Sequence, residues 1–262
     1  MLPALVLALA ACEPPPPSPP AFDEATAFLF RAFDQPSETD LAFALRAAEE
    51  TLRTDLDLEG PTEARSLTLP PLTAEDVADV TRPPDTDPST AQTMFVAARS
   101  AFPPARHAAL QLRDDQRPLE PNAPDHYERT FREGRGCWLD RDCALRTSND
   151  LVRKSAVVVI PFVLRKDFRW VDMDVVDPDA TAPRWAYVAR SWVPERATGG
   201  IDTLHQQYSV EAWIPDDDGL VRFISLYYDV ETPLVPEAAA RLTAQSGIDA
   251  IFRAAEEALA AE

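Results

Sequence analysis

The sequence predicts an α+β fold, in which an antiparallel β-meander is preceded by helices and covered by a long C-terminal helix. Apolar and aromatic residues come in strand-length runs from Ser155 to Val230, with turn residues between the runs. Two amphipathic helical patterns precede this region, and an alanine-rich helical pattern follows it. The last helix has an apolar stripe that must be buried, so we expect it to pack on the sheet.

Five segments of the meander have strand character. Ser155–Leu164 is rich in β-branched residues, and its Pro161 favours an edge position or a bulge. The charged triplet Arg165–Asp167 is expected to form a corner before the second strand. Asp216–Gly219 is typical of a hairpin turn. The expected strands are Ser155–Leu164, Phe168–Val176, Arg184–Val193, Leu204–Ile214 and Leu220–Val230.

Leu204–Ile214 alternates most regularly between apolar and polar residues. One face is expected to carry Leu204, Tyr208, Val210, Ala212 and Ile214, and the other His205, Gln207, Ser209 and Glu211. Gln206 interrupts the apolar face and Trp213 the polar one. Because few strands are strictly one-sided, we expect cover over most of one face and part of the other.

Helical periodicity defines the elements on both sides of the meander. Ala21–Phe33 has apolar residues at helical spacing, and Pro36 ends this pattern. Ser37 is the expected N-cap of a second helix, with Asp40 at its third position. The last helix is expected from Pro236 to Glu262. Its stripe consists of Ile248, Ile251, Phe252, Ala255 and Leu259.

Recurring prolines make residues 57–124 difficult to assign. Thr73–Val80 is predicted as a short capped helix, Thr93–Ala101 as a regular element of undecided type, and Ala108–Leu112 as a short strand. Asp125–Glu133 is predicted as a short helix ended by Gly134.

The charge balance argues against a nucleic-acid partner. The 262 residues include 44 Asp and Glu but only 25 Lys and Arg, for a net charge of −19. A phosphate backbone is bound by basic surface, which this chain lacks. The acidic residues are spread along the chain, which favours a solubilising surface over an acidic binding face.

The N-terminus carries the most specific motif. Met1–Cys12 reads MLPALVLALAAC, an apolar run too short to span a bilayer but suited to an export signal. Leu9-Ala10-Ala11-Cys12 resembles the lipobox of bacterial lipoproteins. The resemblance implies cleavage before Cys12, a diacylglycerol on its thiol, and acylation of the new amine, for example with palmitate. The alternative is a buried N-terminal helix.

A proline run follows the lipobox. Glu13–Pro20 reads EPPPPSPP and is expected to be a polyproline II spacer of roughly 25 Å. The sequence therefore divides into a signal peptide (1–11), a lipidated cysteine with its linker (12–20) and a single α+β domain (21–262). Pro14 replaces the aspartate that retains some lipoproteins at the inner membrane, which favours the outer membrane.

Cys137 and Cys143 are the two cysteines outside the lipobox. In an exported protein such a pair becomes a disulfide. A metal site is disfavoured, because five residues separate the pair and no histidine neighbours it.

No catalytic or phosphate-binding motif occurs, so we expect no catalytic residue and no cofactor. His205, near Glu211 on the polar strand face, is a candidate acid–base residue, although a surface histidine is the simpler interpretation. Two aspartate clusters, at 172–179 and 216–218, favour turns over calcium binding and give no metal site. The aromatic residues of the meander are either core or the lining of a cavity.

The order of elements resembles the helix-grip of START-like lipid-binding domains, with no shared motif. Residues 149–230 are also similar to uncharacterised lipoproteins of Gram-negative bacteria. We therefore expect a non-catalytic envelope lipoprotein, with its domain in the periplasm or at the cell surface, that binds a hydrophobic ligand or a partner protein. A structural envelope protein without a ligand, and a hydrolase with an unrecognised site, are the alternatives.

Overall fold

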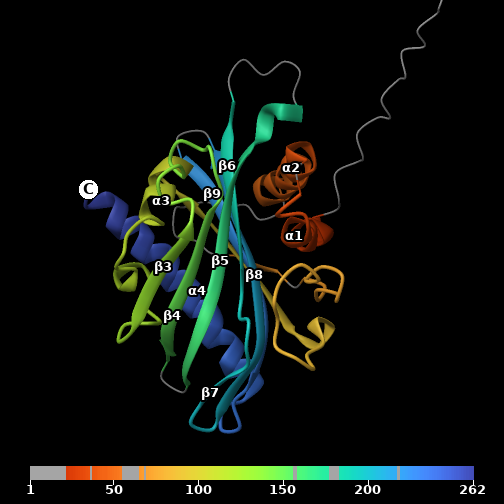
Figure 1. The fold of residues 1–262 in the computed structure, drawn as a ribbon, viewed down its shortest axis with the longest axis vertical. Coiled ribbons are helices and arrows are strands. Elements are labelled where there is room, and N and C mark those ends of the chain that lie inside the picture. The colour runs from red at the N-terminus through yellow and green to blue at the C-terminus, as the bar shows by residue number, and fades with distance from the viewer. Residues whose placement is uncertain are drawn as a thin grey trace, which may run out of the picture.

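The computed structural model describes residues 22–35, 37–54, 65–67, 69–155, 158–176, 183–216 and 219–262. In this part of the chain, nine antiparallel strands form one sheet, and helices lie on both of its faces (Figure 1). The strand order is β1-β2-β9-β8-β6-β5-β4-β3, with β7 paired to β8. The predicted α+β class is confirmed.

The elements have the following bounds. The strands are β1 (Arg65–Leu67), β2 (Gln92–Ser100), β3 (Tyr127–Glu133), β4 (Leu145–Lys154), β5 (Val159–Asp172), β6 (Trp185–Trp192), β7 (Ala197–Gly199), β8 (Asp202–Asp216) and β9 (Gly219–Glu231). The α-helices are α1 (Phe22–Arg31), α2 (Glu38–Thr54), α3 (Pro104–Leu110) and α4 (Glu237–Ala260). Short 3₁₀ turns occur at Pro88–Thr90, Arg117–Leu119 and Met173–Val176.

Helices α1 and α2 cover one face of the sheet (Figure 1). The expected cap is present, since the backbone N–H of Asp40 donates to the Ser37 hydroxyl. The apolar residues of both helices form the largest core with inward residues of β2, β6, β8 and β9. Buried Arg190 on β6 pairs with Asp34, just after α1, and with Asp79. Apolar burial and ion pairing thus both attach this layer to the sheet.

Helix α4 runs across the opposite face (Figure 1), so the predicted packing of the last helix on the sheet is confirmed. Its residues Ile248 and Phe252 pack on Val96 of β2 and Ile224 of β9. Farther along, Ala255 and Leu259 pack on residues of α3 and the following turn. The first half of α4 is mostly exposed, so only its second half is anchored by a continuous apolar stripe.

Strands β8 and β9 form a long hairpin that closes at Asp216 and Gly219, as predicted. One prediction for β8 is wrong. A β-bulge between Leu204 and Gln206 shifts the register, which places Leu204 on the α4 face, away from Tyr208. Gln206 lies on the same face as Tyr208, as expected, and donates to the carbonyl of Asp87.

The predicted corner Arg165–Asp167 is also wrong, because these residues lie inside the continuous strand β5. Pairing with β4 and β6 on either side holds the strand straight through the triplet. Its charges are neutralised within the fold, Lys166 by Glu211 and Asp167 by Arg146. The first two expected strands therefore merge into one.

Three short predictions fail in the middle of the chain. Asp125–Glu133 contains strand β3, because its alternating residues pair with β4, a strand that the sequence analysis did not identify. Ala108–Leu112 overlaps the end of helix α3, which begins with Pro104 at a position where proline is well tolerated. Thr73–Val80 forms turns instead of a helix. Thr93–Ala101 corresponds to β2.

Candidate functional site

Two cavities adjoin between α4 and the sheet. The first, here called the apolar cavity, has a volume of about 140 Å³. The second, here called the polar cavity, has a volume of about 90 Å³. Both are lined by Arg153, Gln207, Leu226 and Ile248, so they meet along one boundary.

The apolar cavity lies beneath the first half of α4. The helix contributes small side chains here, Ala240, Thr243 and Ala244, which lie on one face because they are three or four residues apart. Its volume is similar to that of an engineered cavity of about 150 Å³ that binds benzene. The sheet contributes Ile160, Phe162, Leu204, Leu226, Tyr228 and Val230.

At Gly247, helix α4 approaches Asn122 closely, and both residues line the apolar cavity. A Cβ atom at this position would lie 2.5 Å from the Nδ2 atom of Asn122. Only glycine lets the helix come this close without displacing the asparagine.

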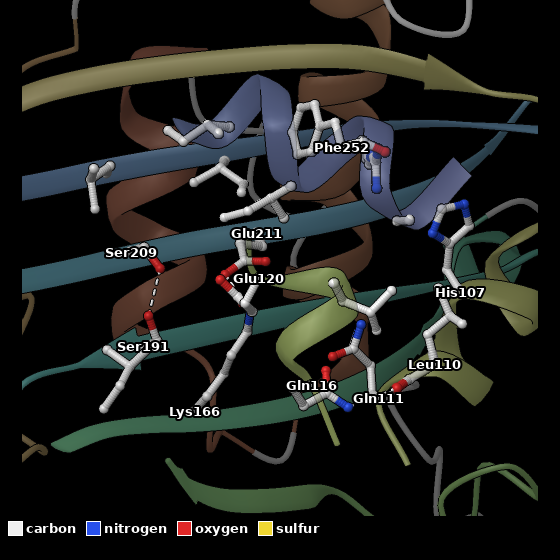
Figure 2. Close-up of a pocket in the computed structure, with 18 of the residues that line it drawn as sticks. His107, Leu110, Gln111, Gln116, Glu120, Lys166, Ser191, Ser209, Glu211 and Phe252 are labelled. Atoms are coloured by element: carbon white, nitrogen blue, oxygen red, sulfur yellow. Dashed lines mark hydrogen bonds and ion pairs between the residues drawn. The ribbon is translucent and has the colours of Figure 1, made fainter. Parts of the chain in front are cut away.

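The polar cavity contains a buried ion pair that spans strand β6, which lies between β5 and β8 in the sheet. Lys166 Nζ of β5 lies 2.5 Å from Glu211 Oε1 of β8, and each side chain is only about a tenth exposed. The ammonium also lies 5.3 Å from the ring centroid of Phe168. Close by, the hydroxyl groups of Ser191 and Ser209 are 2.6 Å apart (Figure 2). This polar surface faces the cavity, not the solvent.

A second polar group lies where the polar cavity meets the end of α4. The Arg222 guanidinium is buried, stacks 4.0 Å from the ring centroid of Phe252, and donates to the Phe252 carbonyl. Burial lowers the pKa of Arg222 to about 10, so the side chain stays protonated at neutral pH. Glu256 lies 3.8 Å from Arg222 and 3.6 Å from His107 Nε2.

His107 on α3 closes this end of the polar cavity (Figure 2). Its Nε2 atom is 2.7 Å from the Ser100 hydroxyl. Burial, helped by the positive charges of Arg222 and Arg106, lowers the pKa of His107 well below its usual value. His107 is therefore neutral at pH 7 and adds no charge to the cavity.

Glu120 lies close to the Lys166–Glu211 pair, as Figure 2 shows. Burial of its carboxyl group raises the pKa of Glu120, and the nearby Glu211 carboxylate adds to this effect. Arg153 and Lys166 act in the opposite direction. A raised pKa favours the protonated form of a carboxyl group, and only that form can donate a hydrogen bond.

The residues singled out from the sequence lie apart from these cavities. Cys12 falls outside the described residues. Cys137 and Cys143 form a disulfide bond in the structure, with a Cα–Cα distance of 5.7 Å. Between them, Trp138 is fully buried, and its indole N–H donates to the Ala108 carbonyl. The bond thus fixes a loop that inserts a tryptophan into the core.

The sequence places His205 near Glu211 on one strand face, but in the structure His205 pairs with a different carboxylate. Its Nε2 atom lies 3.3 Å from Glu231 on β9, and it lines neither cavity. Within the part of the chain that the structure describes, no three His, Cys, Asp or Glu side chains gather as a metal-binding group. Asp177, Asp179, Asp217 and Asp218 of the aspartate clusters lie outside that part.

Most aromatic residues of the meander form core, not cavity. Trp170 and Tyr187 pack on each other and on Trp138, which precedes the meander, with ring centroids 5.2–5.7 Å apart. Tyr187 in turn stacks on Trp213 at 4.2 Å. Among the meander's Trp and Tyr residues, Trp213 and Tyr228 line the cavities.

Five charged residues line the site without having been predicted as site residues, and of these Glu211 was noted only as a neighbour of His205. They are Glu120, Arg153, Lys166, Glu211 and Arg222. For Glu211, the sequence does contain an indication: the polar residues of β8 alternate strictly, which assigns them to one face of the strand. Such a stripe is normally read as solvent-facing, and only the position of α4 shows that it is enclosed.

None of the helices among the described residues is long and apolar enough to cross a membrane.

Comparisons with known proteins found no matching family model and no matching curated protein. Solved structures with a similar chain path include TTHA0849 from Thermus thermophilus, at 17% identity and a TM-score of 0.42, covering 64% of this chain and 97% of that one. They also include a STAR-related lipid transfer protein from Xanthomonas axonopodis, at 11% identity and a TM-score of 0.43, covering 64% and 85%. The third is Ara h 8.0201, at 15% identity and a TM-score of 0.39, covering 66% and 99%. At these values the function must be argued from this chain's own residues.

Proposed function

We propose that this protein binds a small apolar or amphiphilic molecule between α4 and the sheet, without catalysing a reaction on it. The observation that carries the proposal is the apolar cavity of about 140 Å³, which continues into the polar cavity. A site with a mostly apolar lining and a few converging polar groups is typical of small-molecule binding. The volume is below the 300–1,000 Å³ common for drug-sized ligands, so a larger ligand requires α4 to move outward.

The first half of α4 is suited to such a movement. It is mostly exposed and covers the apolar cavity with Ala240, Thr243 and Ala244, which bury little area. The second half is held by Phe252 and Leu259. Little apolar surface is therefore lost when the first half separates from the sheet.

We further propose that the protein is a lipoprotein of the bacterial envelope, anchored through Cys12. The lipobox supports acylation at Cys12, and the proline-rich spacer would separate the anchor from the folded domain. Two or more acyl chains would make the membrane attachment stable. Wild-type protein should partition into the detergent phase of a phase-separation assay, whereas Cys12→Ser should remain in the aqueous phase. If both proteins stay aqueous, the anchor assignment is wrong.

The binding proposal is tested with N-phenyl-1-naphthylamine, a neutral dye whose fluorescence rises in apolar surroundings. The full chain carrying Cys12→Ser is used, so that no acyl anchor competes for the dye. We expect saturable binding that Ala244→Phe abolishes, because the added ring occupies the apolar cavity. Ala238→Phe adds the same ring on the exposed surface of α4 and serves as the matched control. Equal dye binding by both variants would refute binding at this cavity and favour a structural envelope protein.

A further inference from the structure

We propose that the ligand of the adjoining cavities carries an acidic group, and that Arg153 on β4 is the residue that binds it. The inference rests on the proposed function and specifies the ligand class as an aliphatic carboxylate. Arg153 lines both cavities, so its side chain lies where apolar lining gives way to polar lining.

In the part of the chain that the structure describes, Arg153 has no anionic partner of its own. Among the described residues, no carboxylate oxygen lies within 4.0 Å of its guanidinium nitrogens, and its Nε atom is inaccessible to solvent without a hydrogen-bond acceptor. The guanidinium lies 5.6 Å from the ring centroid of Phe162, which belongs to the apolar cavity. A buried donor without an acceptor is costly, and an acceptor supplied by a ligand removes that cost.

The other two cations of the polar cavity differ from Arg153 in having a carboxylate within 4.0 Å, although the Nε atom of Arg222 is also buried without an acceptor. Lys166 is paired with Glu211, and Arg222 donates to the Phe252 carbonyl near Glu256. Glu256 is itself within 4.0 Å of Arg222 and His107. These groups largely neutralise one another, so Arg153 is the cationic group left for a ligand.

Among the charged neighbours of Glu120, Arg153 acts most strongly on its carboxyl group, although the two make no direct ion pair. Burial raises the pKa of Glu120, which favours the neutral carboxyl group, and in that form Glu120 can donate a hydrogen bond to an anionic oxygen. A ligand carboxylate between Arg153 and Glu120 would then accept from both. Arginine binds a carboxylate through two parallel N–H donors, which also fixes its orientation.

The apolar cavity determines the remainder of the ligand. From Arg153 its lining continues through Phe162 and Leu204 to Val230 without another charged side chain except Lys154 at the rim. A carboxylate at Arg153 would therefore place its hydrocarbon chain among these residues and beneath Ala244. The geometry points to a single-chain aliphatic acid in preference to a neutral or cationic amphiphile.

The test compares decanoate, 1-decanol and decylamine as competitors for the dye, using the full chain with Cys12→Ser. These molecules share one chain length and differ in the charge of the head group. We expect decanoate to bind at least about tenfold more tightly than decanol, because charge-assisted hydrogen bonds are stronger than neutral ones. Decylamine should bind most weakly.

Arg153→Met removes the charge while keeping a flexible apolar side chain, and should reduce the preference for decanoate to about onefold. Decanol binding should be unchanged, which also shows that the variant is folded. Arg253→Met is the matched control, because it removes an exposed arginine of α4 and changes the net charge equally. This variant should keep the preference for decanoate. Equal affinity of the wild type for decanoate and decanol, or a preference that survives Arg153→Met, would overturn this inference alone. Failure of all three molecules to displace the dye would overturn the proposed ligand class. Absence of dye binding would overturn the proposed function itself.

Discussion

Replacing Phe252 by alanine tests how firmly α4 is held on the sheet. The ring is 4% exposed and packs against residues of β2 and β9. Large-to-small changes of buried phenylalanine cost about 3–5 kcal/mol. Because one side of the ring faces the polar cavity, less tight packing is lost, so we expect about 3 kcal/mol. The stacking partner Arg222 also loses its aromatic contact.

The assay is urea unfolding followed by circular dichroism, with thermal unfolding as a second readout. For a protein of this size, about 3 kcal/mol corresponds to a fall in melting temperature of roughly 6–12 °C. Leu242→Ala on the same helix is the control, because Leu242 is 68% exposed and should change stability by less than about 0.5 kcal/mol. Equal effects of the two substitutions would refute the packing of α4 described here.

Three further predictions concern the disulfide bond and two buried charged groups. Cys137 and Cys143 should form one cross-linked peptide in unreduced protein from the envelope, and two free thiols would contradict this. Glu120→Gln should stabilise the protein more at pH 7 than at pH 4: burial raises the folded pKa of Glu120, so its contribution to stability is present at low pH and is lost as pH rises through that value. If the unfolding free energies of wild type and Glu120→Gln differ by the same amount at pH 4 and pH 7, this prediction is wrong. Lys166→Met should destabilise by about 3–5 kcal/mol because it leaves buried Glu211 unpaired, and adding Glu211→Gln should recover part of this loss; no recovery would argue against direct pairing.

Elements with strong local signals were predictable from the sequence. The Ser37 cap, the Asp216–Gly219 hairpin and the stripe of α4 each depend on residues close together in the chain. Predictions failed where pairing with a distant segment decides the structure. β3 resembles a helix locally, but its register with β4 makes it a strand, and Arg165–Asp167 resembles a turn until β4 and β6 pair on either side.

The site was less predictable than the fold. Lys166, Glu211 and Arg222 are polar residues on strands, and nothing local indicates that α4 encloses them. Arg153 and Glu120 come from segments that the sequence analysis left without an element. The β-bulge at Leu204 also has no signal in the local sequence, yet it directs this side chain into the apolar cavity. Such a site depends on contacts between distant segments, which periodicity does not report.

The central claim is that a molecule occupies the space beneath the first half of α4. Native mass spectrometry of protein purified from its own membrane tests it most directly, by comparing wild type with Ala244→Phe and Ala238→Phe. We predict one bound amphiphile per chain in wild type and Ala238→Phe, and none in Ala244→Phe, because the added ring fills the cavity lined by Ala244. Wild-type protein without a bound molecule, or the same molecule retained by Ala244→Phe, would contradict the claim.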